Sequence, residues 1–117
     1  MNARILIVED EALLARNMTR YLERQGHEVT AEATMKAGVA RFEEGAPDIL
    51  LVDHNLPDGT GLEIIRHIRR SDLSTKIVMI TAHGSVAIAV EAMKAGADDY
   101  LTKPVSLEEV ALLVGLL

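Results

Sequence analysis

The sequence contains no cysteine, and only three of its 117 residues are aromatic. Without cysteine the chain has no disulfide, no zinc–thiolate site and no thiol nucleophile, which is consistent with a cytoplasmic protein. The core must therefore consist of aliphatic side chains and methionine, and a hydrophobic content of 49% is enough to build one. The length suits one domain, residues 1–117, of ordinary size.

Long apolar runs and an excess of positive charge are also missing. The longest apolar run, Val110 to Leu117, is far shorter than the roughly 20 residues that span a bilayer. The apolar run near the N-terminus, Ile5 to Val8, is too short for a secretory signal. The net charge of -6 disfavours a nucleic acid backbone as a direct partner. We therefore expect no contact of this domain with membranes or nucleic acids.

Short apolar runs alternate five times with segments of helical periodicity. The predicted strands are 4–8, 28–33, 48–53, 76–81 and 99–102, and the predicted helices are 12–25, 35–44, 62–70, 86–95 and a last one that opens at Ser106. This alternation predicts an α/β fold with a parallel sheet covered on both faces, most simply the flavodoxin-like (βα)5 sandwich with strand order 2-1-3-4-5. Residues 55–61 are loop by composition.

Polar side chains follow four of the predicted strands. Glu9 and Asp10 come after the first strand and Asp53 ends the third, while Thr81 ends the fourth and Lys103 follows the fifth. In an open α/β sheet, ligands bind beyond the carboxyl ends of the strands. We therefore expect these acids, the hydroxyl and the amine to converge on one edge of the sheet.

Three acids at one edge would repel one another and raise each other's pKa, unless a divalent cation lies between them. Mg²⁺, or Mn²⁺ in its place, takes oxygen ligands and needs only one or two carboxylates besides waters and a phosphate oxygen. We expect Asp10 and Asp53 to bind the metal directly, the backbone carbonyl of Asn55 to add a ligand, and Glu9 to act through water. Lys103 would neutralise Asp53 or an incoming phosphoryl oxygen.

Such a site suits in-line phosphoryl transfer, which needs a positioned oxygen nucleophile surrounded by cations. Asp53 would be the nucleophile and would form an aspartyl phosphate. Thr81 and a backbone N–H of the loop after it would hold the phosphoryl oxygens. His83 lies two residues after Thr81 and is a candidate modulator of hydrolysis.

Some of these residues also have simpler interpretations. Asp10 could cap the helix that follows it, and Lys103 could be an ordinary solvated lysine. Glu9 beside Asp10 and Asp53 elsewhere disfavour the first reading, and Pro104, which follows Lys103 and fixes the loop, disfavours the second. The cluster Arg66, Arg69 and Arg70 is most simply a solvated helix face.

The sequence resembles the receiver domain of bacterial two-component response regulators over essentially its whole length. The resemblance is carried by Ile-Leu-Ile-Val-Glu-Asp at 5–10, Leu-Leu-Val-Asp-His-Asn-Leu-Pro-Asp-Gly-Thr-Gly-Leu-Glu at 50–63, Met-Ile-Thr-Ala at 79–82 and Ala-Gly-Ala-Asp-Asp-Tyr-Leu-Thr-Lys-Pro at 95–104. It implies a phosphoprotein that takes a phosphoryl group from a sensor histidine kinase onto Asp53. The domain would catalyse only its own phosphorylation and dephosphorylation, and would not be an enzyme in the usual sense.

The resemblance also implies a switch. Thr81 and Tyr100 would be the switch pair, Lys103 would sense the phosphoryl group, and the Lys103–Pro104 bond would be cis. We expect the surface of the fourth and fifth helices to carry a phosphorylation-dependent homodimer. Residues 81–97 are similar to receivers of the nitrogen-regulator class. A receiver of this kind would be part of a longer regulator that controls an output, most simply transcription.

Two other functions are compatible with the fold class. A phosphatase of the haloacid-dehalogenase type also uses an aspartate at a strand end and Mg²⁺, but it needs a second acid two residues later, where this chain has Asn55. A flavin-binding electron carrier would need hydroxyls and glycines in its first loop, where Glu9, Asp10 and Glu11 would repel a phosphate. Both alternatives are disfavoured.

Overall fold

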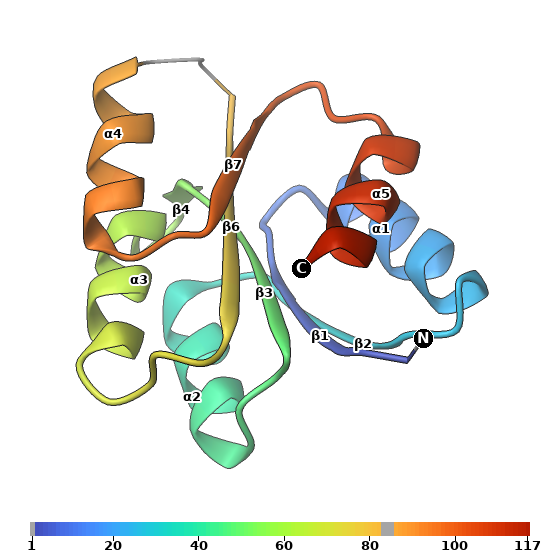
Figure 1. The fold of residues 1–117 in the computed structure, drawn as a ribbon, viewed down its shortest axis with the longest axis horizontal. Helices are drawn as coiled ribbons and strands as arrows, with labels where there is room; N and C mark the ends of the chain where they lie inside the picture. The colour runs from blue at the N-terminus through green and yellow to red at the C-terminus, as the bar shows by residue number, and fades with distance from the viewer. Residues whose placement is uncertain (1, 83–85) are drawn as a thin grey trace.

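The computed structural model describes residues 2–82 and 86–117 and shows a sheet between two layers of helices (Figure 1). Its elements are β1 (Arg4–Val8), α1 (Ala12–Arg24), β2 (Glu28–Glu32), α2 (Met35–Glu44), β3 (Ile49–Asp53), β4 (Asn55–Leu56), β5 (Gly59–Thr60), α3 (Gly61–Arg69), β6 (Lys76–Thr81), α4 (Val86–Ala95), β7 (Asp99–Thr102) and α5 (Leu107–Leu116). The predicted elements are confirmed to within about two residues at their ends, the usual uncertainty of such boundaries.

The five-stranded sheet is parallel and has the order β2-β1-β3-β6-β7. This is the predicted flavodoxin-like order, because β4 and β5 form a separate hairpin. β3 lies at the centre of the sheet, and all five of its residues are buried. Its last residue, Asp53, therefore emerges at the middle of the carboxyl edge.

Alternate residues of each strand pack under different helices, because successive side chains of a strand point to opposite faces. On one face Ile7, Leu51 and Val78 pack with residues of α1 and α5. On the other, Val52 and Met79 pack with residues of α2, α3 and α4. This arrangement explains why the central strands β1, β3 and β6 are apolar at nearly every position. Burying each such side chain contributes about 1.5–3 kcal/mol, so both layers hold the sheet edge in place.

Residues 55–61 differ from the predicted loop. Asn55 pairs with Thr60 and Leu56 with Gly59 in a short antiparallel hairpin, with a turn between them. The next helix begins at Gly61, one residue earlier than predicted, because Thr60 caps it: its Oγ1 accepts a hydrogen bond from the Glu63 N–H at 3.2 Å. Composition alone identified the turn residues but could not show that their flanks pair.

The cap predicted at Ser106 is confirmed by a hydrogen bond of 3.3 Å from the Glu109 N–H to the Ser106 hydroxyl. The Lys103–Pro104 peptide bond is cis, as the family resemblance implied.

The interpretation of Arg69 as part of a solvated helix face was wrong. Its Nε donates to the Gly96 carbonyl at 3.0 Å, and one terminal nitrogen donates to the Asp72 carbonyl at 3.2 Å. The other terminal nitrogen forms an ion pair of 3.2 Å with Asp98. Asp98 in turn accepts the Ile77 N–H at 2.8 Å. This group, the Arg69 clasp, joins the ends of α3 and α4 to the beginning of β6.

Candidate functional site

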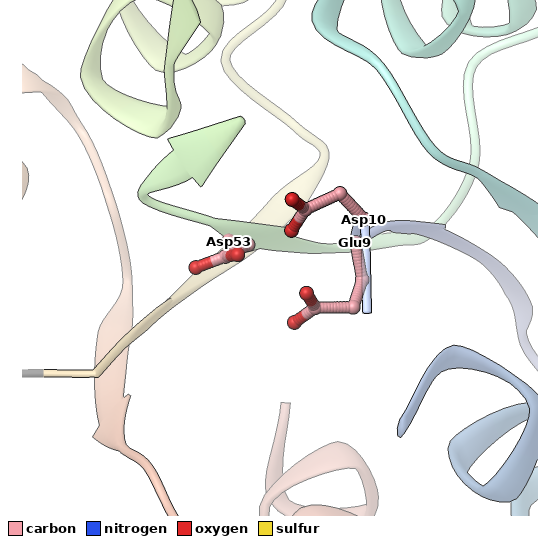
Figure 2. A group of neighbouring side chains, drawn as sticks. All are labelled: Glu9, Asp10 and Asp53. Atoms are coloured by element: carbon pink, nitrogen blue, oxygen red, sulfur yellow. The ribbon is translucent and has the colours of Figure 1, made fainter. Parts of the chain in front are cut away.

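The carboxyl edge of the sheet brings together the acids that the sequence placed at strand ends. Val8 is in register with Val52, so Glu9 and Asp10 leave β1 beside Asp53 at the end of β3. Figure 2 shows the three side chains gathered there, Glu9 and Asp10 from the end of β1 and Asp53 from β3. Ligand oxygens of the three carboxylates lie within 4.8 Å of one another. The predicted convergence of these acids is thus what the fold produces.

Two of the three acids are shielded from water. Glu9 and Asp53 are each 2% exposed, whereas Asp10 is exposed. Burial of like charges in one place is unfavourable, because each carboxylate loses hydration and repels the others. Burial is the largest effect on Glu9 and, with the nearby charge of Asp53, raises its pKa from an ordinary 4.5 to about 7, although the Glu11 N–H and Lys103 act in the opposite direction.

Lys103 is the cation that faces this cluster. Its Nζ lies 3.3 Å from Asp53 Oδ2 and 3.0 Å from Glu9 Oε1, and it also contacts the Glu11 carboxylate. Burial alone would lower the pKa of Lys103, but the contacts with Glu11, Glu9 and Asp53 outweigh burial and raise that pKa well above its usual range. Lys103 is therefore charged and bound to several acids at once, and is not an ordinary solvated lysine.

Glu11 is the site residue that sequence reasoning assigned no role. Its carboxylate is exposed and reaches Lys103 from the loop before α1. The available signal was the unbroken acidic run Glu9, Asp10 and Glu11. The run by itself indicates only that a bound phosphate would be repelled, because the direction of the third side chain depends on tertiary structure.

The remaining predicted residues surround the cluster. Asn55 follows Asp53 closely, and its N–H donates to Asp53 Oδ1 at 3.3 Å. Thr81 ends β6, 2% exposed, and is in register with Thr102 of β7. Tyr100 lies two residues before Thr102 and is 39% exposed. His83 lies outside the described residues.

The donor set at this edge fits a hard divalent cation. All three side chains offer carboxylate oxygens, the ligand type that Mg²⁺ and Mn²⁺ prefer. Glu9 Oε1 is buried and makes no hydrogen bond, although Lys103 lies nearby. With one lysine opposite four acids, counting Glu11, the edge keeps an excess of negative charge that a cation would neutralise.

An open parallel sheet of this order, with acids and a lysine gathered at its carboxyl edge, places the chain in the class of flavodoxin-like domains with a polar site at that edge. More narrowly, the chain belongs to the response regulator receiver domain family, whose family model matches residues 5–114. Within the described ranges, every helix is too short to cross a membrane.

Several relatives share this domain. The chain is 44% identical over 115 residues to the transcriptional regulatory protein TrcR of Mycobacterium tuberculosis, covering 97% of this chain and 45% of TrcR. It is 43% identical over 107 residues to the transcriptional regulatory protein PhoP of Escherichia coli, covering 92% of this chain and 48% of PhoP. The chain thus spans about half the length of these curated relatives.

A solved structure confirms the fold. The response regulator receiver domain protein (CheY-like) from Methanospirillum hungatei superposes with a TM-score of 0.94 at 31% identity, covering 99% of this chain and 93% of that one. The chain is therefore a receiver domain of two-component response regulators, and the phosphatase and flavoprotein alternatives are not favoured.

Proposed function

We propose that Asp53 accepts a phosphoryl group from a phosphohistidine of a sensor histidine kinase, in a reaction that needs Mg²⁺ or Mn²⁺. The observation that carries this proposal is the position of the Asp53 carboxylate, which lies close to two other acids and to the ammonium of Lys103. A carboxylate oxygen of Asp53 attacks phosphorus while the bond to the donor nitrogen breaks. The product is an aspartyl phosphate.

Asp10 and Asp53 would hold the metal directly, with the Asn55 carbonyl as a further ligand and Glu9 acting through water. When bound, the metal supplies positive charge beside the transferred oxygens. Lys103, which already contacts Asp53 at 3.3 Å, would pair with a phosphoryl oxygen. The Thr81 hydroxyl would donate to another. Apart from these transfers onto and off its own Asp53, we propose no catalytic activity.

Phosphoryl transfer to Asp53 can be tested by intact mass after incubation with Mg²⁺ and a small phosphodonor. Wild type should gain one phosphate and Asp53→Asn none. Asp99→Asn is a matched control, because it removes one carboxylate charge from β7 and keeps the oxygen that accepts the Tyr100 N–H. A full gain of phosphate by Asp53→Asn would refute the assignment.

Metal binding has its own test in Asp10. Asp10→Ala removes an exposed carboxylate from a site with few protein ligands, so Mg²⁺ affinity in calorimetric titrations should fall strongly. Unchanged affinity would mean that the metal lies elsewhere.

The output of phosphorylation would be a change at the surface of α4, β7 and α5. A phosphoryl group on Asp53 would draw the Thr81 hydroxyl inward, and Tyr100, on the adjacent strand, could then rotate toward the vacated space. β7 runs between α4 and α5 (Figure 1), and these elements carry exposed apolar side chains, Val90 and Met93 on α4, Tyr100 on β7 and Leu112 on α5. This surface suits a two-fold homodimer.

Sedimentation with and without beryllofluoride, a mimic of the phosphoryl group, tests this output. Beryllofluoride should promote association of wild type and have a weaker effect on Thr81→Ala. An association state that never changes, or that changes equally in both proteins, would contradict the switch.

We further propose that residues 1–117 are the receiver part of a longer transcriptional regulator of the nitrogen-regulator class. The curated relatives are about twice as long as this chain, which supports a longer regulator. The class is supported only by the similarity of residues 81–97. The gene sequence after Leu117 tests both points. A cytoplasmic location and a modulating role for His83 stay predictions.

A further inference from the structure

The β4–β5 hairpin, which follows Asp53, is bonded to a helix far away in the sequence. Asp58, in the turn of the hairpin, accepts the Met35 N–H with Oδ1 at 2.7 Å and the Lys36 N–H with Oδ2 at 3.0 Å. Both oxygens of one carboxylate therefore bind the first turn of α2. These N–H donors hold the pKa of Asp58 below its usual value.

The bond serves α2 as a second cap. The first N–H groups of a helix have no partner within the helix and carry partial positive charge, so a carboxylate is favourable there. Thr34 caps the Ala37 N–H at 3.1 Å, and Asp58 satisfies the two N–H groups that Thr34 leaves. Thr34 belongs to the α2 segment itself, whereas Asp58 belongs to the hairpin, so of these two caps it is Asp58 that connects the hairpin to α2.

Steric contacts complete the attachment of the hairpin. A Cβ at Gly59 would lie 2.4 Å from Met35 Sδ, so the hairpin backbone rests closely on the side chain that begins α2. On the other flank, a Cβ at Gly61 would lie 2.9 Å from the Asp53 carbonyl oxygen, so α3 begins directly against the site. The hairpin is thus held between α2 and α3, and Asp58 provides its hydrogen bonds to α2.

We infer that Asp58 is a positioning residue for the metal site. By bonding the hairpin to the N-terminus of α2, it fixes the backbone of Asn55 beside Asp53. Asn55 is paired with Thr60 within this hairpin, and its N–H bonds to Asp53, so a shift of the turn is transmitted to the site. The inference rests on the proposed function, in which the Asn55 carbonyl is a metal ligand. Without such a role, Asp58 would only stabilise α2.

The test compares Asp58→Ala with Thr34→Ala, a matched variant that removes a cap from the same helix but leaves the hairpin attached. Calorimetric titration with Mg²⁺ alone should give a dissociation constant about tenfold higher for Asp58→Ala, as for other residues that orient metal ligands. Thr34→Ala should bind Mg²⁺ like wild type. Asp58→Asn keeps one acceptor oxygen, so its affinity should lie between those of Asp58→Ala and wild type.

A second measurement separates positioning from chemistry. At saturating Mg²⁺, the phosphorylation rate of Asp58→Ala should return to the wild-type value, because its nucleophile is intact. Unchanged Mg²⁺ affinity in Asp58→Ala, or an equal loss in Thr34→Ala, would overturn the role of Asp58. If Asp58→Ala does not fold by circular dichroism, the comparison of Asp58→Asn with Thr34→Ala decides in the same way. A wild-type domain that binds no Mg²⁺ would instead overturn the proposed function, and the role of Asp58 with it.

Discussion

The two ends of β7 each hold a half-buried cation, and the two cations have opposite surroundings. Arg69 pairs with Asp98, just before the strand, and Lys103 follows the strand. Their side chains are almost equally buried, at 11% and 12% exposed. Burial therefore does not distinguish them, and the comparison isolates the effect of charge balance.

In the Arg69 clasp each charge and each polar atom named above has a partner. The guanidinium bonds two backbone carbonyls and one carboxylate, and that carboxylate also accepts a backbone N–H. One positive charge thus meets one negative charge in fixed geometry. Fully satisfied networks of this kind add rigidity, and the clasp leaves no excess charge for a ligand to neutralise.

At the other end, Lys103 contacts Glu9, Glu11 and Asp53, and Asp10 adds a further negative charge. Burial, with a smaller effect of the Asp53 charge, raises the pKa of Glu9, and the surplus of acids leaves a set of oxygens suited to a cation. The difference shows how one strand can carry a stabilising cluster at its beginning and a strained, ligand-dependent cluster at its end.

The clasp should show the largest effect on stability. Arg69→Ala leaves Asp98 and two carbonyls without their partner, so the free energy of unfolding should fall by about 3 kcal/mol. Urea unfolding followed by circular dichroism measures this, and Mg²⁺ affinity should stay unchanged. Arg70→Ala removes an exposed neighbour and should change stability by less than about 0.5 kcal/mol. If Arg69→Ala and Arg70→Ala lose the same free energy of unfolding, the clasp stabilises the domain no more than an exposed arginine does.

Lys103→Met should have a smaller effect that depends on metal. Without Mg²⁺ it leaves the acids unpaired and should cost about 2 kcal/mol, less than the loss of the Arg69 clasp because Glu9 can take up a proton. Saturating Mg²⁺ should restore most of the loss, because a ligand that binds only the folded state stabilises it. The exposed lysine variant Lys76→Met serves as the control. A loss that Mg²⁺ does not reverse would make Lys103 structural, like Arg69.

The sequence predicted the metal-site end of β7 better than the clasp end. Asp53 and Lys103 could be placed because each directly follows or ends a strand, and parallel strands bring their carboxyl ends to one edge. Arg69 lies in the last turn of a helix, where its environment depends on how α3 meets the turn at Gly96. No local pattern carries that contact.

The hairpin was missed for a similar reason. Its strands have two residues each, and its bonds run from Asp58 to Met35 and Lys36 in another element. Local composition predicts a turn there, but pairing and attachment arise only from the packed fold. Strand ends are thus readable from sequence, whereas contacts between helix ends and loops are not.

The surplus of acids also predicts a pH dependence. The pKa of Glu9 is raised to about 7 in the metal-free fold, and metal binding favours the charged carboxylate and releases its proton. Mg²⁺ affinity should therefore fall as the pH drops below about 7, by up to about tenfold per pH unit. Calorimetry between about pH 6 and pH 8 in buffers of different ionisation enthalpy would detect the released proton. Glu9→Gln should show a flatter profile, and a flat profile for wild type would contradict this account.

The smallest expected effect comes from removing one acidic charge, and its sign differs between the clusters at the two ends of β7. Asp98→Asn removes the charge that balances Arg69 and should destabilise the domain. Asp53→Asn removes one charge from a cluster that already has too many, so without Mg²⁺ it should raise the free energy of unfolding by about 1 kcal/mol.

The reason for this gain lies in the neighbours of Asp53. Its charge is one of the causes that raise the pKa of Glu9, so in Asp53→Asn that pKa should fall and Lys103 should pair with Glu9 and Glu11 under less repulsion. Saturating Mg²⁺ should cancel the gain, because the variant has lost a metal ligand and wild type is stabilised more by the ion. Urea unfolding of wild type, Asp53→Asn and Asp98→Asn, each with and without Mg²⁺, measures all of these differences. If Asp53→Asn is less stable than wild type in the absence of Mg²⁺, the acids at this edge are balanced after all, and the contrast with the Arg69 clasp fails.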